Sequence, residues 1–272
     1  SPKACLRINQ WCARSIWGWW VLMAEVQNNI DVRITGDRLP MRENAFVTAN
    51  HQSIADVMVL FSLGWRCGRV GDMKWFVKDI LKWIPGPGWG MYMLNCVFLK
   101  RNWAKDKSDV MALFSKFKKR DIPVFLISFL EGTRITPEKV AAAQAFARER
   151  GMYVPEKTLV PRTKGFVATL HGLGDHLDAV YDLTICYPEG IPSIGACFLR
   201  KVRRVDIHVK RYPISDFQRS DAELADWVFE RYREKDELLL AHAENQAFPG
   251  EVTYGPVNPW DYFKSESKIS VD

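Results

Sequence analysis

Residues 45–65 read AFVTANHQSIADVMVLFSLGW, and this stretch indicates how the chain of 272 residues folds. Residues 45–49 are apolar or β-branched and predict a buried strand. A short polar turn follows at 50–53, and residues 54–65 place apolar side chains at helical spacing. A strand joined to a helix by a short turn is the repeating unit of α/β domains, so this stretch favours that class.

The same alternation of strands and helices continues on both sides of this stretch. Residues 122–129 are almost wholly apolar, as expected of a strand covered on both faces. Ser220 and Glu223 have the spacing of a capping box that opens a long helix. Further strands are predicted at 31–36, 97–99, 179–187 and 205–209, and further helices at 109–120 and 137–150. We therefore predict an α/β fold with a central, mostly parallel or mixed sheet flanked by helices.

Composition bounds the organisation of the chain and the chemistry open to it. Apolar residues make up 47% of the sequence, which suits one domain at 29–250 between an N-terminal segment, 1–28, and an irregular tail, 251–272. The six cysteines form no CxxC pair, and the sequence holds no HExxH, P-loop or GxSxG pattern. We expect reduced thiols, no metal and no cofactor.

Two aromatic and basic stretches raise the possibility of a membrane surface. Residues 4–26 hold four of the eleven tryptophans beside basic side chains. That mixture suits an amphipathic helix in the lipid headgroup region, and docking on the protein's own core is the alternative. Residues 74–83 carry a lysine at every fourth position, so a helix there would present a basic stripe. The net charge of +6 fits an anionic membrane as partner, and nothing predicts nucleic acid.

The longest uncharged run, residues 83–99, contains two prolines and three glycines. These residues break a straight helix, and a membrane-spanning helix needs about 20 apolar residues. We therefore predict a buried or interfacial loop that leads into the strand at 97–99, and no membrane-spanning helix.

The turn after the strand at 45–49 contains the first chemical candidate. His51 follows the strand, and Asp56 falls five residues later in the first turns of the predicted helix. The carboxylate of Asp56 can fold back onto one imidazole nitrogen, which leaves the other to take a proton. These residues are predicted to form a general base and its orienting group. A polar turn that merely caps the helix is the alternative interpretation.

A second candidate follows the most apolar predicted strand. Residues 131–134 read Glu-Gly-Thr-Arg, and ligands of α/β proteins bind at the carboxyl ends of strands. Gly132 would let the backbone approach an anion, and Thr133 and Arg134 can donate hydrogen bonds to a phosphate. Glu131 would need a partner or a substrate hydroxyl. A loop salt bridge between Glu131 and Arg134 is the alternative.

A third candidate is the basic pair Lys100 and Arg101, which ends the predicted strand at 97–99. A solvated strand end explains this pair equally well on its own. If the three strands are parallel neighbours, however, their carboxyl ends meet at one edge of the sheet. The three candidates would then form one site.

The order of these motifs resembles that of the 1-acyl-glycerol-3-phosphate acyltransferase family of lysophospholipid acyltransferases. The resemblance rests on Asn-His-x4-Asp, Phe-Leu-Lys-Arg, Phe-x-Glu-Gly-Thr-Arg and Val-Pro-Arg-Thr-Lys-Gly-Phe, within about 30–215. It looks closest to the branch that contains the lysocardiolipin acyltransferases. Leu130 stands where the family usually has proline, which alters loop rigidity more than chemistry.

The resemblance implies a function. His51 would deprotonate the free hydroxyl of a lysophospholipid, with lysophosphatidic acid as the first choice, and Asp56 would orient the imidazole. The acceptor would attack an acyl thioester, from acyl-CoA or acyl-carrier protein, without an acyl-enzyme. By family match Arg101, with Arg134, would hold the phosphate, and Lys100 could assist.

The remaining motif residues and the location also follow from the resemblance. Glu131, Gly132 and Thr133 would shape the phosphate pocket, and Pro161 would be a structural residue on the acyl-donor side. The protein would sit at the cytoplasmic face of a bacterial inner membrane or an organelle membrane.

Two alternatives stay open at this point. Another acceptor, such as lysocardiolipin or lysophosphatidylglycerol, or transacylation between phospholipids would use the same scaffold. A non-catalytic peripheral protein that binds anionic lipid belongs to a different class.

Overall fold

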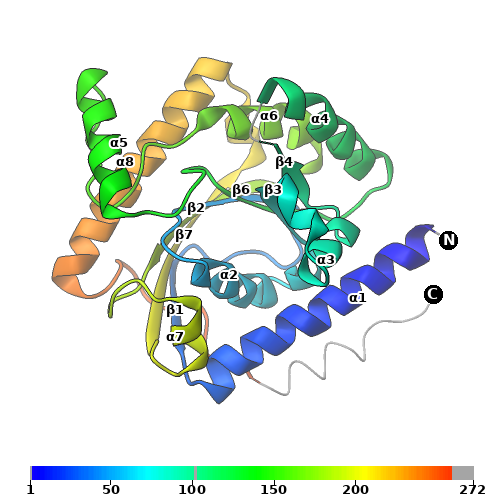
Figure 1. Cartoon of the computed structure of the whole chain (residues 1–272), viewed down its shortest axis with the longest axis horizontal. Helices are drawn as coiled ribbons and strands as arrows, with labels where there is room; N and C mark the ends of the chain where they lie inside the picture. Colours follow the sequence, from blue (N-terminus) through cyan, green and yellow to red (C-terminus); the bar gives the residue numbers. More distant parts are fainter. Residues whose placement is uncertain (1, 101–102, 259–272) are drawn as a thin grey trace.

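A computed structural model describes residues 2–100 and 103–258 of the chain, and Figure 1 shows its arrangement. Seven strands form one sheet in the order β1-β7-β6-β2-β5-β3-β4. The pair β6/β7 is antiparallel and the other neighbours are parallel, which confirms the predicted mostly parallel, mixed sheet. The strands are β1 Asp31–Gly36, β2 Ala45–Ala49, β3 Met73–Lys78, β4 Val97–Leu99, β5 Phe125–Phe129, β6 Ala179–Cys186 and β7 Arg204–Pro213.

Helices cover both faces of the sheet. The α-helices are α1 Pro2–Val21, α2 Ala55–Arg66, α3 Pro87–Met93, α4 Trp103–Lys119, α5 Pro137–Glu149, α6 Thr163–Leu173, α7 Ile194–Phe198 and α8 Asp221–Asn245. Figure 1 shows α1 and α2 on one side of the sheet and α4, α6 and α8 on the other. Short π or 3-10 turns lie at Leu22–Gln27, Val70–Asp72, Asp79–Trp83, Gly174–His176 and Ile214–Phe217.

The alternation of side chains along β2 explains the two hydrophobic cores. Val47 is buried in the core beneath α1 and α2, whereas Phe46 is buried in the core beneath α4, α6 and α8. Successive strand residues point to opposite faces, so a strand covered on both sides is apolar throughout. Phe166 of α6 stacks on Trp227 of α8, with ring centroids 5.2 Å apart.

The N-terminal helix docks one face on the domain and exposes the other. Trp17 stacks on Phe61 of α2 with ring centroids 4.6 Å apart, so the docking alternative describes this face. The opposite face carries a stripe of exposed apolar side chains, which we call the α1 stripe: Ile8, Trp11, Ile16 and Trp19. Within the described residues, none of the helices combines the length and apolar character needed to cross a bilayer.

The helix considered for residues 74–83 does not form. This segment is most of the strand β3, followed by the 3-10 turn at Asp79–Trp83. Lys74 is buried, and its Nζ donates to the carbonyl oxygens of Asp72 at 3.0 Å and Pro123 at 2.8 Å. Lys82 pairs with Asp79 at 2.8 Å, and the predicted basic stripe is therefore wrong.

The segment at 83–99 and the start of α4 also differ from prediction. Residues 83–99 are not simply a loop leading into a strand, because Pro87 opens the short helix α3 at its first position. Proline suits that position, where its missing N–H has no helical partner to lose. Helix α4 begins at Trp103, six residues before the predicted start.

Candidate active site

The turn between β2 and α2 places His51 against Asp56. The Nδ1 atom of His51 lies 2.9 Å from Oδ2 of Asp56, and the Asp56 side chain is fully buried. The carboxylate sits in the first turn of α2, where backbone N–H groups favour negative charge. With Nδ1 engaged, Nε2 is the nitrogen that can exchange a proton with a substrate.

Three further donors hold the Asp56 carboxylate in place. The backbone N–H groups of Gln52 and Ser53 donate to Oδ2 at 2.7 and 3.0 Å. The hydroxyl of Tyr187, which follows β6, donates to Oδ1 at 2.7 Å. Hydrogen bonds of this kind stabilise the ionised carboxylate that a protonated imidazole requires. No local pattern around residue 187 signalled this partner.

The imidazole plane is set by Phe129 at the end of β5. The two rings stack with centroids 3.9 Å apart and an angle of 11° between their planes. The His51 side chain is 15% exposed, so a small part of the imidazole is accessible to solvent. Asp56 and Phe129 together restrict the imidazole to one orientation.

Glu131 links its own loop to the turn that holds His51 through hydrogen bonds. Its Oε2 accepts from the backbone N–H of His51 at 3.0 Å, and its Oε1 accepts from Leu159 N–H at 3.3 Å. The backbone N–H of Ile135 donates to the carbonyl oxygen of His51 at 2.9 Å. Glu131 is 4% exposed. Burial raises the pKa of its carboxyl group to about 8, despite the backbone hydrogen bonds that favour the ionised form.

The raised pKa of Glu131 predicts a pH dependence of stability. The folded state keeps a proton that the unfolded chain loses above pH 4.5, so the free energy of unfolding falls as the pH rises toward about 8. We expect Glu131→Gln to reduce this fall by about 3 kcal/mol in urea unfolding between pH 5.5 and 8.5.

Glu138→Gln is the control for this experiment, because the carboxyl group of Glu138 is exposed and its hydrogen bond with Thr136 lowers its pKa. This variant is expected to keep the slope of the parent. Equal slopes for all three proteins would show that Glu131 is ionised throughout the range.

The loop after Glu131 gathers cations at the same edge of the sheet. Gly132 adopts φ +68°, and a Cβ there would lie 3.1 Å from Nε of Arg162. Glycine is favoured in this left-handed conformation, and its small size lets the Arg162 side chain lie against the loop. The backbone N–H of Arg162 donates to the carbonyl oxygen of Leu130 at 2.8 Å. Arg162, which the sequence reasoning did not select, therefore lies against the loop at 131–134.

The residues predicted to bind a phosphate differ in how firmly other groups of the protein hold them. Thr133 accepts from Nζ of Lys139 at 2.7 Å through its hydroxyl, and Arg134 is exposed. Lys100 is exposed, and its backbone N–H donates to Asp106 at 3.0 Å. Arg101 lies outside the described residues. The salt bridge considered between Glu131 and Arg134 is not formed, because both carboxylate oxygens of Glu131 accept from backbone groups.

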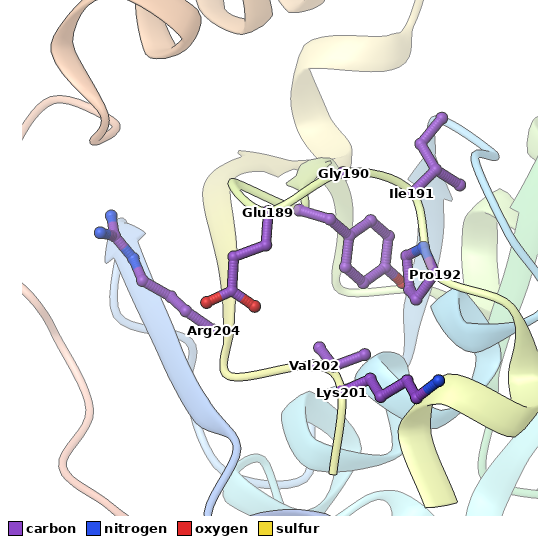
Figure 2. A pocket seen from close by; sticks show the side chains of 8 residues that line it. Glu189, Gly190, Ile191, Pro192, Lys201, Val202 and Arg204 are labelled. Carbon is purple, nitrogen blue, oxygen red and sulfur yellow. The ribbon is translucent and has the colours of Figure 1, made fainter. Parts of the chain in front are cut away.

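Two pockets open along the loop that follows β6. One has a volume of about 200 Å³, and Figure 2 shows the side chains of Glu189, Lys201 and Arg204 around it. The other has a volume of about 260 Å³. Its lining includes Gln52, which follows His51 in the chain, and Ile135, whose backbone N–H donates to the His51 carbonyl oxygen. Among the described residues, no group of three or more histidine, cysteine or carboxylate side chains is placed to hold a metal ion.

These features define a class of protein, an α/β domain with a histidine–aspartate pair at the carboxyl edge of a mostly parallel sheet and cations beside it. The acyltransferase family model matches residues 31–188, and the acyltransferase C-terminus model matches residues 196–265. The chain therefore belongs to the acyltransferase family, as the resemblance of its motifs implied.

Individual relatives agree with this assignment. The chain is 32% identical over 257 residues to 1-acyl-sn-glycerol-3-phosphate acyltransferase 2 of Brassica oleracea, covering 92% of this chain and 66% of the relative. It is 34% identical over 224 residues to lysocardiolipin acyltransferase 1 of Danio rerio, covering 80% and 58%. The chain thus spans about two thirds, or less, of the length of these two relatives.

A solved structure shares the fold. The crystal structure of the 1-acyl-sn-glycerophosphate acyltransferase PlsC from Thermotoga maritima aligns with a TM-score of 0.50 and 21% identity. The alignment covers 86% of this chain and 79% of the other.

Proposed function

We propose that the protein transfers a fatty acyl chain from an acyl thioester to the free hydroxyl of a lysophospholipid, with lysophosphatidic acid as acceptor. The observation that carries the proposal is the 2.9 Å contact between His51 and Asp56 in a chain of this family. Acyl-CoA or acyl-carrier protein would supply the thioester.

The proposed reaction needs no covalent enzyme intermediate. Nε2 of His51 removes the proton from the acceptor hydroxyl while the oxygen attacks the thioester carbonyl carbon. The tetrahedral intermediate then expels the thiolate, which takes the proton from the imidazolium and leaves as the thiol. Asp56 stabilises the positive charge that His51 carries in between, because its buried carboxylate lies against Nδ1.

The phosphate of the acceptor would bind beside this base. Arg134 and Arg162 belong to the loops that meet at Gly132, and guanidinium groups bind phosphate oxygens in pairs. Thr133 and Lys100 would add donors, and Arg101 is assigned the same role by the family resemblance alone. In this arrangement Glu131 positions the backbone of His51 instead of contacting the substrate.

We also propose that the protein works at the cytoplasmic face of a membrane, where acyl thioesters are present. Helix α1 contacts the end of α3, since Nδ2 of Asn9 donates to the carbonyl oxygen of Met93 at 3.3 Å. Trp83, at the end of the 3-10 turn before α3, is 70% exposed. Exposed aromatic rings are typical of a surface that enters the headgroup region.

Removing two rings of the α1 stripe is expected to weaken membrane binding. Replacing Trp11 and Trp19 with serine removes apolar area worth about 2 kcal/mol, so partitioning onto anionic vesicles should fall roughly 30-fold. Flotation with phosphatidylglycerol-containing liposomes measures the fraction of each protein bound to the membrane. Phe146→Ser removes an exposed ring from α5 and should leave binding unchanged, whereas equal losses in the two proteins would contradict a docking role for α1.

The proposed function is tested by thiol release from oleoyl-CoA in the presence of a panel of lysophospholipids. Release that requires lysophosphatidic acid supports the proposal. Faster release with lysocardiolipin or lysophosphatidylglycerol would identify that lipid as the acceptor instead. No release with any acceptor, from either oleoyl-CoA or oleoyl-carrier protein, would contradict acyl transfer and favour a non-catalytic lipid-binding protein.

A further inference from the structure

The histidine–aspartate pair has a third member that comes from the end of the neighbouring strand β6. Tyr187 lies one residue beyond the end of β6 and is 6% exposed. Its hydroxyl donates to Oδ1 of Asp56 at 2.7 Å, while Oδ2 accepts from His51. The three side chains therefore form one continuous hydrogen-bonded row.

The division of donors between the two oxygens of Asp56 gives Tyr187 a specific task. Oδ2 accepts from His51 and from the backbone N–H groups of Gln52 and Ser53, which belong to the same turn. Tyr187 reaches Oδ1 from a loop 131 residues away in the sequence. Without that donor Oδ1 would be a buried acceptor with a lost partner, and the carboxylate could rotate toward another one.

We propose that Tyr187 is a positioning residue of the active site, which holds the Asp56 carboxylate so that Oδ2 faces Nδ1 of His51. The inference rests on the proposed function, in which Asp56 must stabilise the imidazolium form of His51 during each transfer. Tyr187 acts through Asp56 and does not contact the reacting atoms.

The surroundings of Tyr187 keep its hydroxyl a donor. Burial and the neighbouring carboxylate of Asp56 raise its pKa well above the usual value, so the phenol keeps its proton at neutral pH. The neighbouring thiols of Cys186 and Cys197 also raise the pKa of Tyr187. Glu131 is the further carboxyl group that interacts electrostatically with Asp56.

Tyr187→Phe tests the inference, because it removes the hydroxyl and keeps the ring. We expect kcat to fall roughly tenfold, as for loss of one hydrogen bond to a charged group, with KM for both substrates nearly unchanged. The acid limb of the pH–rate profile should move down by about 0.5 pH unit, because an Asp56 carboxylate that turns away from Nδ1 of His51 stabilises the imidazolium form less.

Tyr181→Phe is the matched control. Tyr181 is buried on β6, and its hydroxyl donates to the carboxylate of Glu43, away from the His51 turn. This variant is expected to lose stability without a shift of the acid limb. A Tyr187→Phe enzyme with the kcat and acid limb of the parent would overturn the inference, and so would the same changes in Tyr181→Phe.

A second readout separates the inference from the proposed function. NMR titration of the His51 imidazole, assigned with His51→Ala, should show its midpoint moving downward in Tyr187→Phe. If the parent protein has no acyl transfer activity but this midpoint moves, the proposed function fails and the inference stands. An unchanged midpoint would refute the role of Tyr187 whatever the activity.

Discussion

Replacing His51 with alanine is expected to reduce acyl transfer by about 10² or more, because the reaction would lose the group that takes the acceptor proton. The measurement is acceptor-dependent thiol release from oleoyl-CoA by the variant and the parent. Binding should persist, since Arg134, Arg162 and the membrane-facing side chains are untouched. The loss should therefore be in kcat, with KM for the lysophospholipid nearly unchanged.

His171→Ala is the control for this experiment. His171 is an exposed histidine of α6 that pairs with Asp221 at 2.6 Å, away from the site. The His171→Ala variant should keep the activity of the parent. Equal thiol release by the His51→Ala enzyme would refute general-base catalysis by His51, and an equal loss in both variants would point to damage to the fold.

Replacing Lys235 with methionine is expected to lower the free energy of unfolding by about 3–5 kcal/mol, because it breaks a buried ion pair. Nζ of Lys235 donates to Oδ1 of Asp182 at 2.6 Å and to the carbonyl oxygen of Leu183 at 2.7 Å, and it is fully buried. The variant leaves the Asp182 carboxylate without its cation. Urea unfolding at pH 7 measures the change.

A second substitution distinguishes the lost pair from lost packing. Exchanging Asp182 for leucine in the Lys235→Met protein removes the stranded charge and should recover most of the lost stability. Exposed pairs contribute far less, so Arg233→Met on the same helix, which pairs with Glu230, is the matched control. If the double variant is no more stable than Lys235→Met, the cost comes from packing around Lys235.

Local sequence patterns predicted most elements of the fold. The apolar run at 45–49, the capping box of Ser220 and Glu223, and the helix predicted at 137–150 are each found where expected. These signals act within one turn or strand, so nearby residues are enough to interpret them. The spacing of His51 and Asp56 was interpretable for the same reason, since the first turn of α2 brings residues five apart into contact.

The segment at 74–83 shows where a local pattern is ambiguous. A spacing of four places lysines on one face of a helix, but four is also a multiple of the strand period of two. Lys74 and Lys78 therefore fit the strand β3, which the helical interpretation overlooked. Nothing local shows that Lys74 would be buried against the carbonyl of Pro123, 49 residues away.

Local sequence patterns predicted the α/β class, the strand–turn–helix that holds His51 and Asp56, and the motifs that relate the chain to its family. They did not predict that Tyr187 supports Asp56, that Glu131 turns inward, or that Lys235 is buried against Asp182. These contacts form because neighbouring strands, and the helices packed on them, bring together residues far apart in the chain. The hydrogen bonds of Tyr187 and Lys235 span 131 and 53 residues, and no local periodicity records such distances.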